Sequence, residues 1–290
     1  SVVIDVLALE EGANVSVYTG ASTLVGSVSG LSRMESYEFN LNVLKYDVVR
    51  VESNVKILTY YNNGGSSGDD FHPLAPVDTE LYGVPASTLY VGCTEDSTSI
   101  TVYPSDTTLG IASTLTCAKG EMKSIATATL GTGPAIRLVS DKAIAASGVN
   151  DGTGTDSEIL VPARFMANAF TLSHNADYVT LASRQIGAEW KVYDSSNVEK
   201  SSGTFSGNGG DGYPGKALLT GIAAGDFIVT SSPAMAYYDE ASQDVETGIV
   251  PWPIYSNSIS RTVNGGENIY TPVGGYFDDF SSNTLSSYSN

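Results

Sequence analysis

The chain has 290 residues, of which 41% are hydrophobic and only 16% are charged, and its 32 acidic side chains against 14 Lys and Arg give a formal net charge of -18. It is long enough to bury one large core or two to three ordinary ones. The charge argues against nucleic acid and anionic membrane surfaces as partners, because phosphate binding depends on Lys and Arg. No apolar run reaches the roughly 18 residues of a membrane-spanning helix, so we expect no membrane insertion.

The composition favours strands and turns over helices. The 17 Tyr residues suit pleated strands, and the 30 Gly residues suit the turns between them. Runs of Ala, Leu, Glu and Lys at helical spacing are scarce. We therefore expect an all-β fold.

A Val-Tyr pair closes an alternating apolar run at three places along the chain. The pairs are Val17-Tyr18, Val102-Tyr103 and Val192-Tyr193. At a similar distance after each pair, an apolar segment is interrupted by a polar turn centred on Ser53, Ser140 or Ser231. A true repeat keeps its landmarks and their spacing, and this one recurs with a period of roughly 90 residues. The sequence thus predicts one β-rich unit used three times.

A Val-Pro dipeptide closes a further apolar run near the expected end of each unit. The dipeptides are Val84-Pro85, Val161-Pro162 and Val250-Pro251. Proline lacks the donor that a central strand requires, so these positions indicate strand ends or unit boundaries. We predict three tandem β-sandwich-like repeats, at residues 1–85, 86–162 and 163–251, with 252–290 as a C-terminal arm or partial fourth unit. A short helix is expected only within residues 161–170, with Pro162 in its first turn.

Motifs for catalysis are absent from the sequence. His72 and His174 lack the spacing of a zinc site, and no nucleophile elbow or phosphate-binding glycine loop occurs. A polysaccharide hydrolase would need two facing carboxylates, and the 32 acidic residues single out no pair. We expect no enzymatic activity and no cofactor other than calcium.

Two acidic loops are candidates for binding calcium. One loop carries Asp151, Asp156 and Glu158, and another ends at Asp69 and Asp70. Calcium takes several carboxylate and carbonyl oxygens from one such loop. Neither loop has the spacing of an EF-hand, so solvated acidic loops are the alternative.

The two cysteines, Cys93 and Cys117, are too few for a disulfide scaffold and lack metal-ligand spacing. We expect buried free thiols. A disulfide between neighbouring strands is the alternative.

Aromatic residues of the C-terminal arm are the candidates for contacts between subunits. They are Trp252, Tyr255, Tyr270, Tyr276, Phe277 and Phe280. Such an arm can add a strand to a neighbouring subunit, and a loosely ordered terminus is the alternative. The pairs Tyr60-Tyr61 and Tyr237-Tyr238 stand at equivalent places in two units, which favours a shared packing role.

Two resemblances bear on function. The segments VSDKAIAASG (139–148) and VTSSPAMAYYD (229–239) are similar to a signature in IgGFc-binding-type repeats of large surface proteins. The first unit departs from it, since VESNVKILTYY (51–61) has no Pro and no small residue after the turn. This resemblance implies an adhesive or structural β-module without catalytic residues. The whole chain also resembles structural proteins of tailed bacteriophages, which are acidic, cysteine-poor and rich in Tyr, Asn, Ser and Gly.

These features predict a non-catalytic structural component of a virion or similar extracellular assembly, such as a decoration, tail or fibre protein. We expect a homo-oligomer whose partners are itself and other structural proteins. The alternative is a cell-surface or secreted adhesin module that binds a host glycan, receptor or protein. The expected location is the virion, or the cell surface or extracellular space for the alternative.

Overall fold

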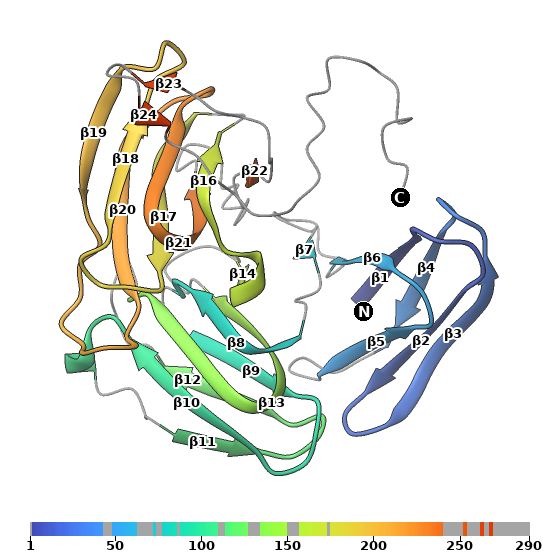
Figure 1. Ribbon diagram of the computed structural model, residues 1–290. Coiled ribbons are helices and arrows are strands. Elements are labelled where there is room, and N and C mark those ends of the chain that lie inside the picture. Colours follow the sequence, from blue (N-terminus) through green and yellow to red (C-terminus); the bar gives the residue numbers. More distant parts are fainter. Residues whose placement is uncertain are drawn as a thin grey trace.

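The computed structural model describes residues 2–42, 48–62, 72–73, 77–85, 88–109, 114–126, 134–149, 157–172 and 175–239, with the short pairs 252–253, 262–263 and 267–268. These residues form antiparallel β-sheets, so the predicted all-β class is confirmed (Figure 1). Their only helical parts are two single turns of 3-10 helix, η1 (Thr107–Leu109) and η2 (Ala163–Phe165). Neither is long enough to cross a membrane as a helix.

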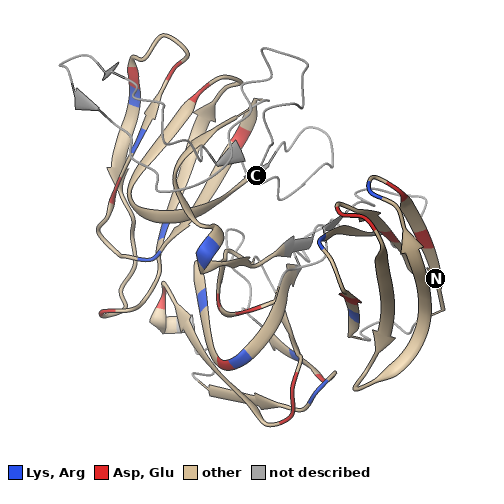
Figure 2. Cartoon of the chain, turned by 45° about the vertical axis from the view of Figure 1, so that its right-hand side comes forward, with Lys and Arg blue, Asp and Glu red and all other residues tan. Residues whose placement is uncertain are grey.

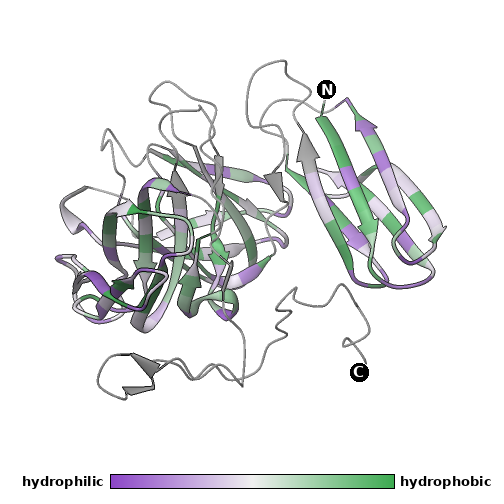
Figure 3. Cartoon of the chain, turned by 90° about the horizontal axis from the view of Figure 1, so that it is seen from above, coloured by the Kyte–Doolittle hydropathy of each residue, from purple (hydrophilic) through white to green (hydrophobic). Residues whose placement is uncertain are grey.

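The first unit is a sandwich of two layers. Its strands are β1 (Val2–Ala8), β2 (Ala13–Thr19), β3 (Thr23–Leu31), β4 (Ser36–Leu41), β5 (Val49–Ser53), β6 (Ile57–Asn62) and β7 (His72–Pro73). One layer has the order β4-β1-β6-β7 and the other the order β3-β2-β5. Apolar and polar residues alternate along these strands, which Figure 3 shows as alternating colours. The apolar set, including Ile4 and Val17, is buried between the layers.

The second and third units repeat this sandwich and add strands to it. The second has β8 (Asp78–Gly83), β9 (Thr88–Cys93), β10 (Thr98–Pro104), β11 (Thr114–Cys117), β12 (Met122–Ala126), β13 (Ile136–Val149), β14 (Ser157–Ile159) and β15 (Val161–Pro162). The third has β16 (Ala167–Thr171), β17 (Ala176–Ser183), β18 (Glu189–Tyr193), β19 (Glu199–Thr204), β20 (Gly215–Ile222), β21 (Phe227–Asp239) and β22 (Trp252–Pro253). A hairpin of β23 (Thr262–Val263) and β24 (Glu267–Asn268) follows.

One long strand belongs to both layers in the second and third units. β13 pairs first with β8 and β10, then bends and pairs with β9. β21 pairs in the same way with β16 and β18, and then with β17. In the first unit this strand is divided into β5, which pairs with β2, and β6, which pairs with β1. All three units therefore share one topology, which confirms the predicted tandem repeat.

The cross-strand register places the Val-Tyr pairs at the same point in each unit. Tyr18 lies opposite Arg50, Tyr103 opposite Arg137, and Tyr193 opposite Phe227. The arginine guanidinium stacks over the tyrosine ring in the first two units, at 4.5 and 5.2 Å from the ring centroid. The pair is thus a repeated cross-strand contact at one edge of the core.

A hydrogen bond at the bend of the long strand recurs in all three units. The acceptors are the side chains of Asn54, Asp141 and Ser231, and the donors are the backbone N–H groups of Asn14, Ser99 and Glu189, at 2.6, 2.7 and 2.8 Å. Three different side chains make this bond at one structural position. We call it the bend bond.

The register also corrects the predicted alignment of the three polar turns by one residue. Thr230 rather than Ser231 is the counterpart of Ser53 and Ser140.

Two predicted boundaries and the predicted helix need correction. β8 pairs with β13, so residues 78–85 lie in the second unit, although the sequence placed them in the first. Val84-Pro85 follows the first strand of a unit, whereas Val161-Pro162 forms its last strand, β15. The counterpart of Pro162 in the third unit is Pro253 rather than Pro251, because β22 pairs with β16 as β15 pairs with β8.

The helix expected within residues 161–170 is confined to the single turn η2. Met166 returns to extended backbone, with φ -67 and ψ 145. From Ala167 onward the chain pairs with β21, and Ala169 and Phe170 are buried in the sandwich. Strand pairing here buries both faces of the segment, which a helix at the surface could not do.

Cys93 and Cys117 form a disulfide, so the preferred prediction of free thiols is wrong and its alternative holds. The bond joins the ends of β9 and β11 and so links the two layers of the second unit, with the Cα atoms 6.2 Å apart. The corresponding core positions hold Ala8 and Leu31 in the first unit and Ser183 and Phe205 in the third, all buried. The disulfide therefore replaces ordinary core packing in one unit of three.

Candidate functional site

The structure leaves the predicted calcium site untested. Asp151 and Asp156 lie outside the described residues, and only the backbone of Glu158 is described, in β14 opposite Gly148. Elsewhere in the described part of the chain, no group of three His, Cys, Asp or Glu side chains could hold a metal ion. The acidic loop stays a prediction.

The predicted aromatic interface is also untested. Trp252 lies in β22, opposite Thr171. The other five residues of this set, Tyr255, Tyr270, Tyr276, Phe277 and Phe280, lie outside the described residues, as does His174. His72 is part of β7, opposite Tyr61.

The described residues instead draw attention to the two junctions between units. At the junction of the second and third units, an apolar cluster crosses the boundary. Its members are Tyr82, Val84, Ala135, Val161, Met166, Ala182, Met235 and Tyr237. Tyr82 and Met235 are each 1% exposed. Such a cluster resembles a domain core more than a surface contact, so these two units form one body.

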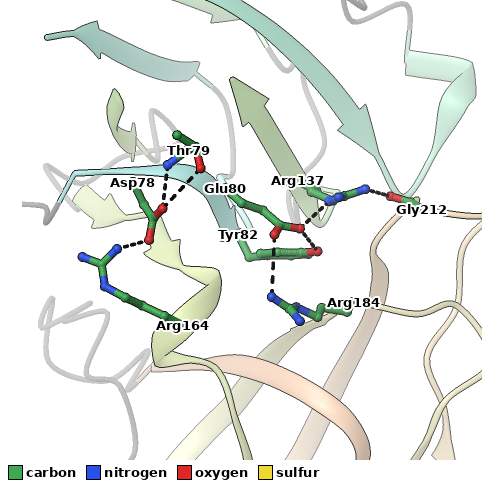
Figure 4. A network of polar contacts seen from close by, with 8 residues as sticks. All are labelled: Asp78, Thr79, Glu80, Tyr82, Arg137, Arg164, Arg184 and Gly212. Atoms are coloured by element: carbon green, nitrogen blue, oxygen red, sulfur yellow. Dashed lines mark hydrogen bonds and ion pairs between the residues drawn. The ribbon is translucent and has the colours of Figure 1, made fainter. Parts of the chain in front are cut away.

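A polar network closes the rim of this cluster (Figure 4). Glu80 accepts hydrogen bonds from the Tyr82 hydroxyl at 2.9 Å and from Arg137 Nε at 2.8 Å. Its second oxygen lies 3.6 Å from Arg184 Nη2, which belongs to the third unit. Burial raises the pKa of Tyr82 well above its usual range, so the hydroxyl remains a donor. Two arginines from different units therefore share one carboxylate.

Asp78 and Arg164 form a further ion pair beside this network, and Asp78 also accepts the backbone N–H of Thr79 at 2.7 Å. Asp78 begins β8, whereas Arg164 lies in η2 between the second and third units. The segment that connects the two units is thus fixed to the first strand of the second unit.

A loop of the third unit makes a second set of contacts with the second unit. Asn208 donates its backbone N–H to Ser105 O at 2.9 Å and its side-chain amide to Asp106 Oδ1 at 3.0 Å. Its amide oxygen accepts the N–H of Thr107 at 2.7 Å. Hydrogen bonds from Thr108 and then from Asn208 hold the pKa of Asp106 below its usual value. The glycine-rich loop at residues 207–212 is thus docked on the second unit.

The junction of the first and second units is different, because it contains a cleft of about 620 Å³. From the first unit the cleft is lined by 48–51 and 57–60, and from the second by residues of β9, β12 and β13, including Tyr90 and Met122. Leu58, Val77 and Phe165, which are 43%, 44% and 45% exposed, also line it. Exposed apolar side chains thus gather here.

The cleft follows a strand edge. Consecutive residues of β5 and β6 line it, whereas a sheet face would present alternate residues. Among the described strands, β5 pairs only with β2. The corresponding parts of β13 and β21 have neighbours on both sides, because β8 and β16 pair with them. We call β8 and β16 the lead strands, and the first unit has no lead strand among the residues the structure describes.

The charges around the cleft contrast with the rest of the chain. Acidic residues are spread over all three units (Figure 2). Arg50 and Lys119 are the charged residues that line the cleft, and no carboxylate is among its lining residues. Arg50 is engaged by Glu52 and by the ring of Tyr18. A neutral or apolar segment can therefore enter this cleft without burying a carboxylate of the cleft wall.

A close backbone approach holds the first and second units together at one end of the cleft. Gly120 has a φ of 72, and a Cβ at this position would overlap the backbone of Gly20. Only glycine fits both the left-handed conformation and the contact. The corresponding turn of the first unit places Met34 in the same left-handed conformation, with φ 65. The Met34 side chain is exposed, so a side chain is tolerated there.

Neither junction is predicted by the sequence patterns. The available signal was the polar and aromatic content of residues 78–84, which contain Asp78, Glu80 and Tyr82 in a strand whose second half is buried. Comparison of the chain with protein-family models, with curated proteins and with solved structures found no match.

Proposed function

We propose that the chain is a non-catalytic structural component of a virion or similar extracellular assembly, in which rigid β-units make contacts between subunits. The observation that carries this proposal is the fusion of the second and third units through an apolar cluster and the Glu80 network. A rigid tandem body of this kind keeps fixed spacing between surfaces at its two ends.

The cleft beside the first unit gives further support. An assembly component needs surfaces that can take up a partner, and the apolar cleft that β5 borders is such a surface. The partners in this proposal are copies of the same chain and other structural proteins of the assembly.

The mass of the full chain in solution tests the proposal. We expect light scattering behind a sizing column to show a defined oligomer or a growing filament at micromolar concentration. The same mass in calcium and in chelator would separate assembly from metal binding by the acidic loop. A monodisperse monomer at every concentration would overturn the proposal.

The disulfide favours a second candidate, a secreted or cell-surface adhesin module. Disulfides form and persist in secreted proteins and at cell surfaces, and they are rare in the cytosol. Cys93 and Cys117 are both nearly inaccessible in the folded second unit. For an adhesin we expect a monomer that retains glycan or protein binding on an array and loses it when Tyr90 in the cleft is replaced by Ala.

A further inference from the structure

The loop that docks the third unit on the second carries an Asn-Gly dipeptide, Asn208-Gly209. In such a dipeptide the glycine nitrogen can reach the carbonyl carbon of the Asn side chain, because glycine has no Cβ to hinder the approach. Asn is a thermolabile residue because of this ring closure. A junction contact that depends on Asn-Gly can therefore be lost through chemistry alone.

The glycine of this pair is required by packing. A Cβ at Gly209 would overlap the side chain of Tyr213. The Tyr213 ring meets the Tyr103 ring of the second unit edge to face, with the ring centroids 5.3 Å apart. Beside it, Gly212 O accepts a hydrogen bond from Arg137 Nη1 at 2.7 Å (Figure 4). This end of the loop is thus fixed on the second unit in a path that only glycine allows.

Asn208 makes the contacts at the other end of the loop. Its amide nitrogen donates to Asp106 Oδ1 at 3.0 Å. Its amide oxygen accepts the backbone N–H and the hydroxyl of Thr107, at 2.7 and 3.0 Å. Its backbone N–H donates to Ser105 O at 2.9 Å. The side-chain amide acts here as donor and acceptor at once, which an ionised carboxylate cannot do.

We propose that Asn208 is a site of spontaneous deamidation, and that this reaction releases the loop from the second unit. The Gly209 nitrogen attacks Asn208 Cγ and forms a bond to it. The bond from Cγ to Nδ2 breaks, and ammonia leaves with the proton of the Gly209 N–H. Water, the only co-reactant, then opens the succinimide ring at either carbonyl and gives aspartate or isoaspartate.

The product opposes docking because it places a second carboxylate against Asp106. The hydrogen bond to Asp106 Oδ1 loses its donor, and two like charges take its place at close range. The isoaspartate product also lengthens the loop backbone by one carbon atom. Since ammonia is lost to solvent, the release is permanent.

Docking in turn slows the reaction. The bonds to Asp106 and Thr107 hold the Asn208 side chain in place, so Cγ meets the Gly209 nitrogen only when these bonds open. The rate of deamidation therefore follows the fraction of time that the loop spends undocked.

Incubation of the full chain at body temperature and mildly alkaline pH, followed by digestion and mass spectrometry, measures the rate at Asn208. We expect conversion about tenfold slower than in a synthetic peptide of residues 204–213, because several hydrogen bonds must open first. Asp106→Ala should raise the rate toward that of the peptide, and Thr107→Val replaces it as the test if Asp106→Ala does not fold. Asp211→Ala is the matched control, since it removes a carboxylate of the same loop that makes none of these contacts.

Hydrogen exchange at the Thr107 amide measures release, because this N–H donates to Asn208 across the junction. We expect exchange about tenfold faster in the converted protein and in Asn208→Asp than in the unconverted wild type. Ser201→Asp adds the same charge at an exposed position of β19 and should exchange as the wild type does.

Three outcomes would overturn the proposal. Asn208 that stays intact in both the wild type and Asp106→Ala, after the peptide has fully converted, would exclude the site. Equal rates in the folded chain and the peptide would show that docking does not restrain the side chain. Wild-type exchange at Thr107 in the converted protein would mean that the loop stays docked. Self-association enters none of these readouts, so the site is tested separately from the proposed assembly.

Discussion

The first unit and the fused body of the second and third units are built from the same topology, yet they differ in how completely each sheet is bordered. In the body, β8 and β16 cover the long strand on its second side, and the units share an apolar cluster. In the first unit, β5 has one neighbour among the described strands and borders a cleft. The same fold thus has strands on both sides of the long strand in the body, and a strand on one side of β5 among the described residues of the first unit.

Substitution of Tyr82 should give the largest difference between the two regions. Tyr82 is 1% exposed and lies in the cluster that joins the second and third units. Tyr82→Ala leaves a cavity and removes a donor to Glu80, at an expected cost of about 3 to 5 kcal/mol. Differential scanning calorimetry should show a lower unfolding temperature for the body and an unchanged transition for the first unit.

Phe39→Ala is the matched variant, because Phe39 is 5% exposed in the core of the first unit alone. It should lower only the transition of the first unit. A single transition that moves with both variants would mean that all three units unfold together.

Removal of the disulfide should have the next largest effect, and only on the body. Cys93→Ala with Cys117→Ala is expected to cost about 2 to 4 kcal/mol, since a closed loop no longer restricts the unfolded chain. Cys93→Ala with Cys117→Leu copies the Ala8 and Leu31 pair of the first unit and should recover part of that loss. Equal denaturation midpoints for the two double variants would refute the equivalence of these positions.

The bend bond should contribute similarly wherever it occurs. Asn54→Ala, Asp141→Ala and Ser231→Ala each remove one side-chain acceptor, at an expected cost of about 1 kcal/mol. Asn54→Ala also removes the hydrogen bond that the Asn54 amide donates to Gly12 O, so its cost should be the largest of the three. The first should destabilise the first unit, and the other two the body. Urea denaturation followed by hydrogen exchange assigns each loss to its unit, and a loss in the wrong region would contradict the assignment.

Acidification should change the stability of the two regions in opposite directions, by a small amount. Burial and then Glu38, which lies opposite on β4, raise the pKa of Asp5. A raised carboxyl pKa means that the first unit gains stability as the pH falls toward that pKa. Asp106 lies at the junction of the second and third units, and its pKa is lowered. Its contribution to the stability of the body is therefore lost only as the pH falls through that lower pKa.

Asp5→Asn isolates the effect in the first unit. We expect a slightly higher unfolding temperature at neutral pH and no further gain on acidification. Thermal scans at neutral and mildly acidic pH provide the measurement. A lower unfolding temperature for this variant at neutral pH would contradict the raised pKa.

The repeat was predictable from sequence because its landmarks are cross-strand pairs. Val17-Tyr18 and its two counterparts are held by the register of the long strand, so they keep their spacing. The boundaries were less predictable, because a Val-Pro dipeptide marks any strand end. Val84-Pro85 follows a first strand, whereas Val161-Pro162 is itself a last strand.

The junctions and the disulfide depend on contacts between segments far apart in the chain. Arg184 reaches Glu80 only because the third unit packs on the second, and no local pattern encodes that distance. Cys93 and Cys117 likewise stand at positions that hold Ala, Leu, Ser or Phe in the other units, so the core pattern alone predicts burial and not bonding.

The continuity of the long strand also has a mechanical consequence. β13 and β21 pass through both layers of their sandwiches, so the layers cannot shear past each other without breaking backbone pairing on one side of the bend. In the first unit, three residues separate β5 from β6, and the two layers are joined there only by a turn. A pulling force along the chain should therefore open the first unit at a lower load than either of the other two.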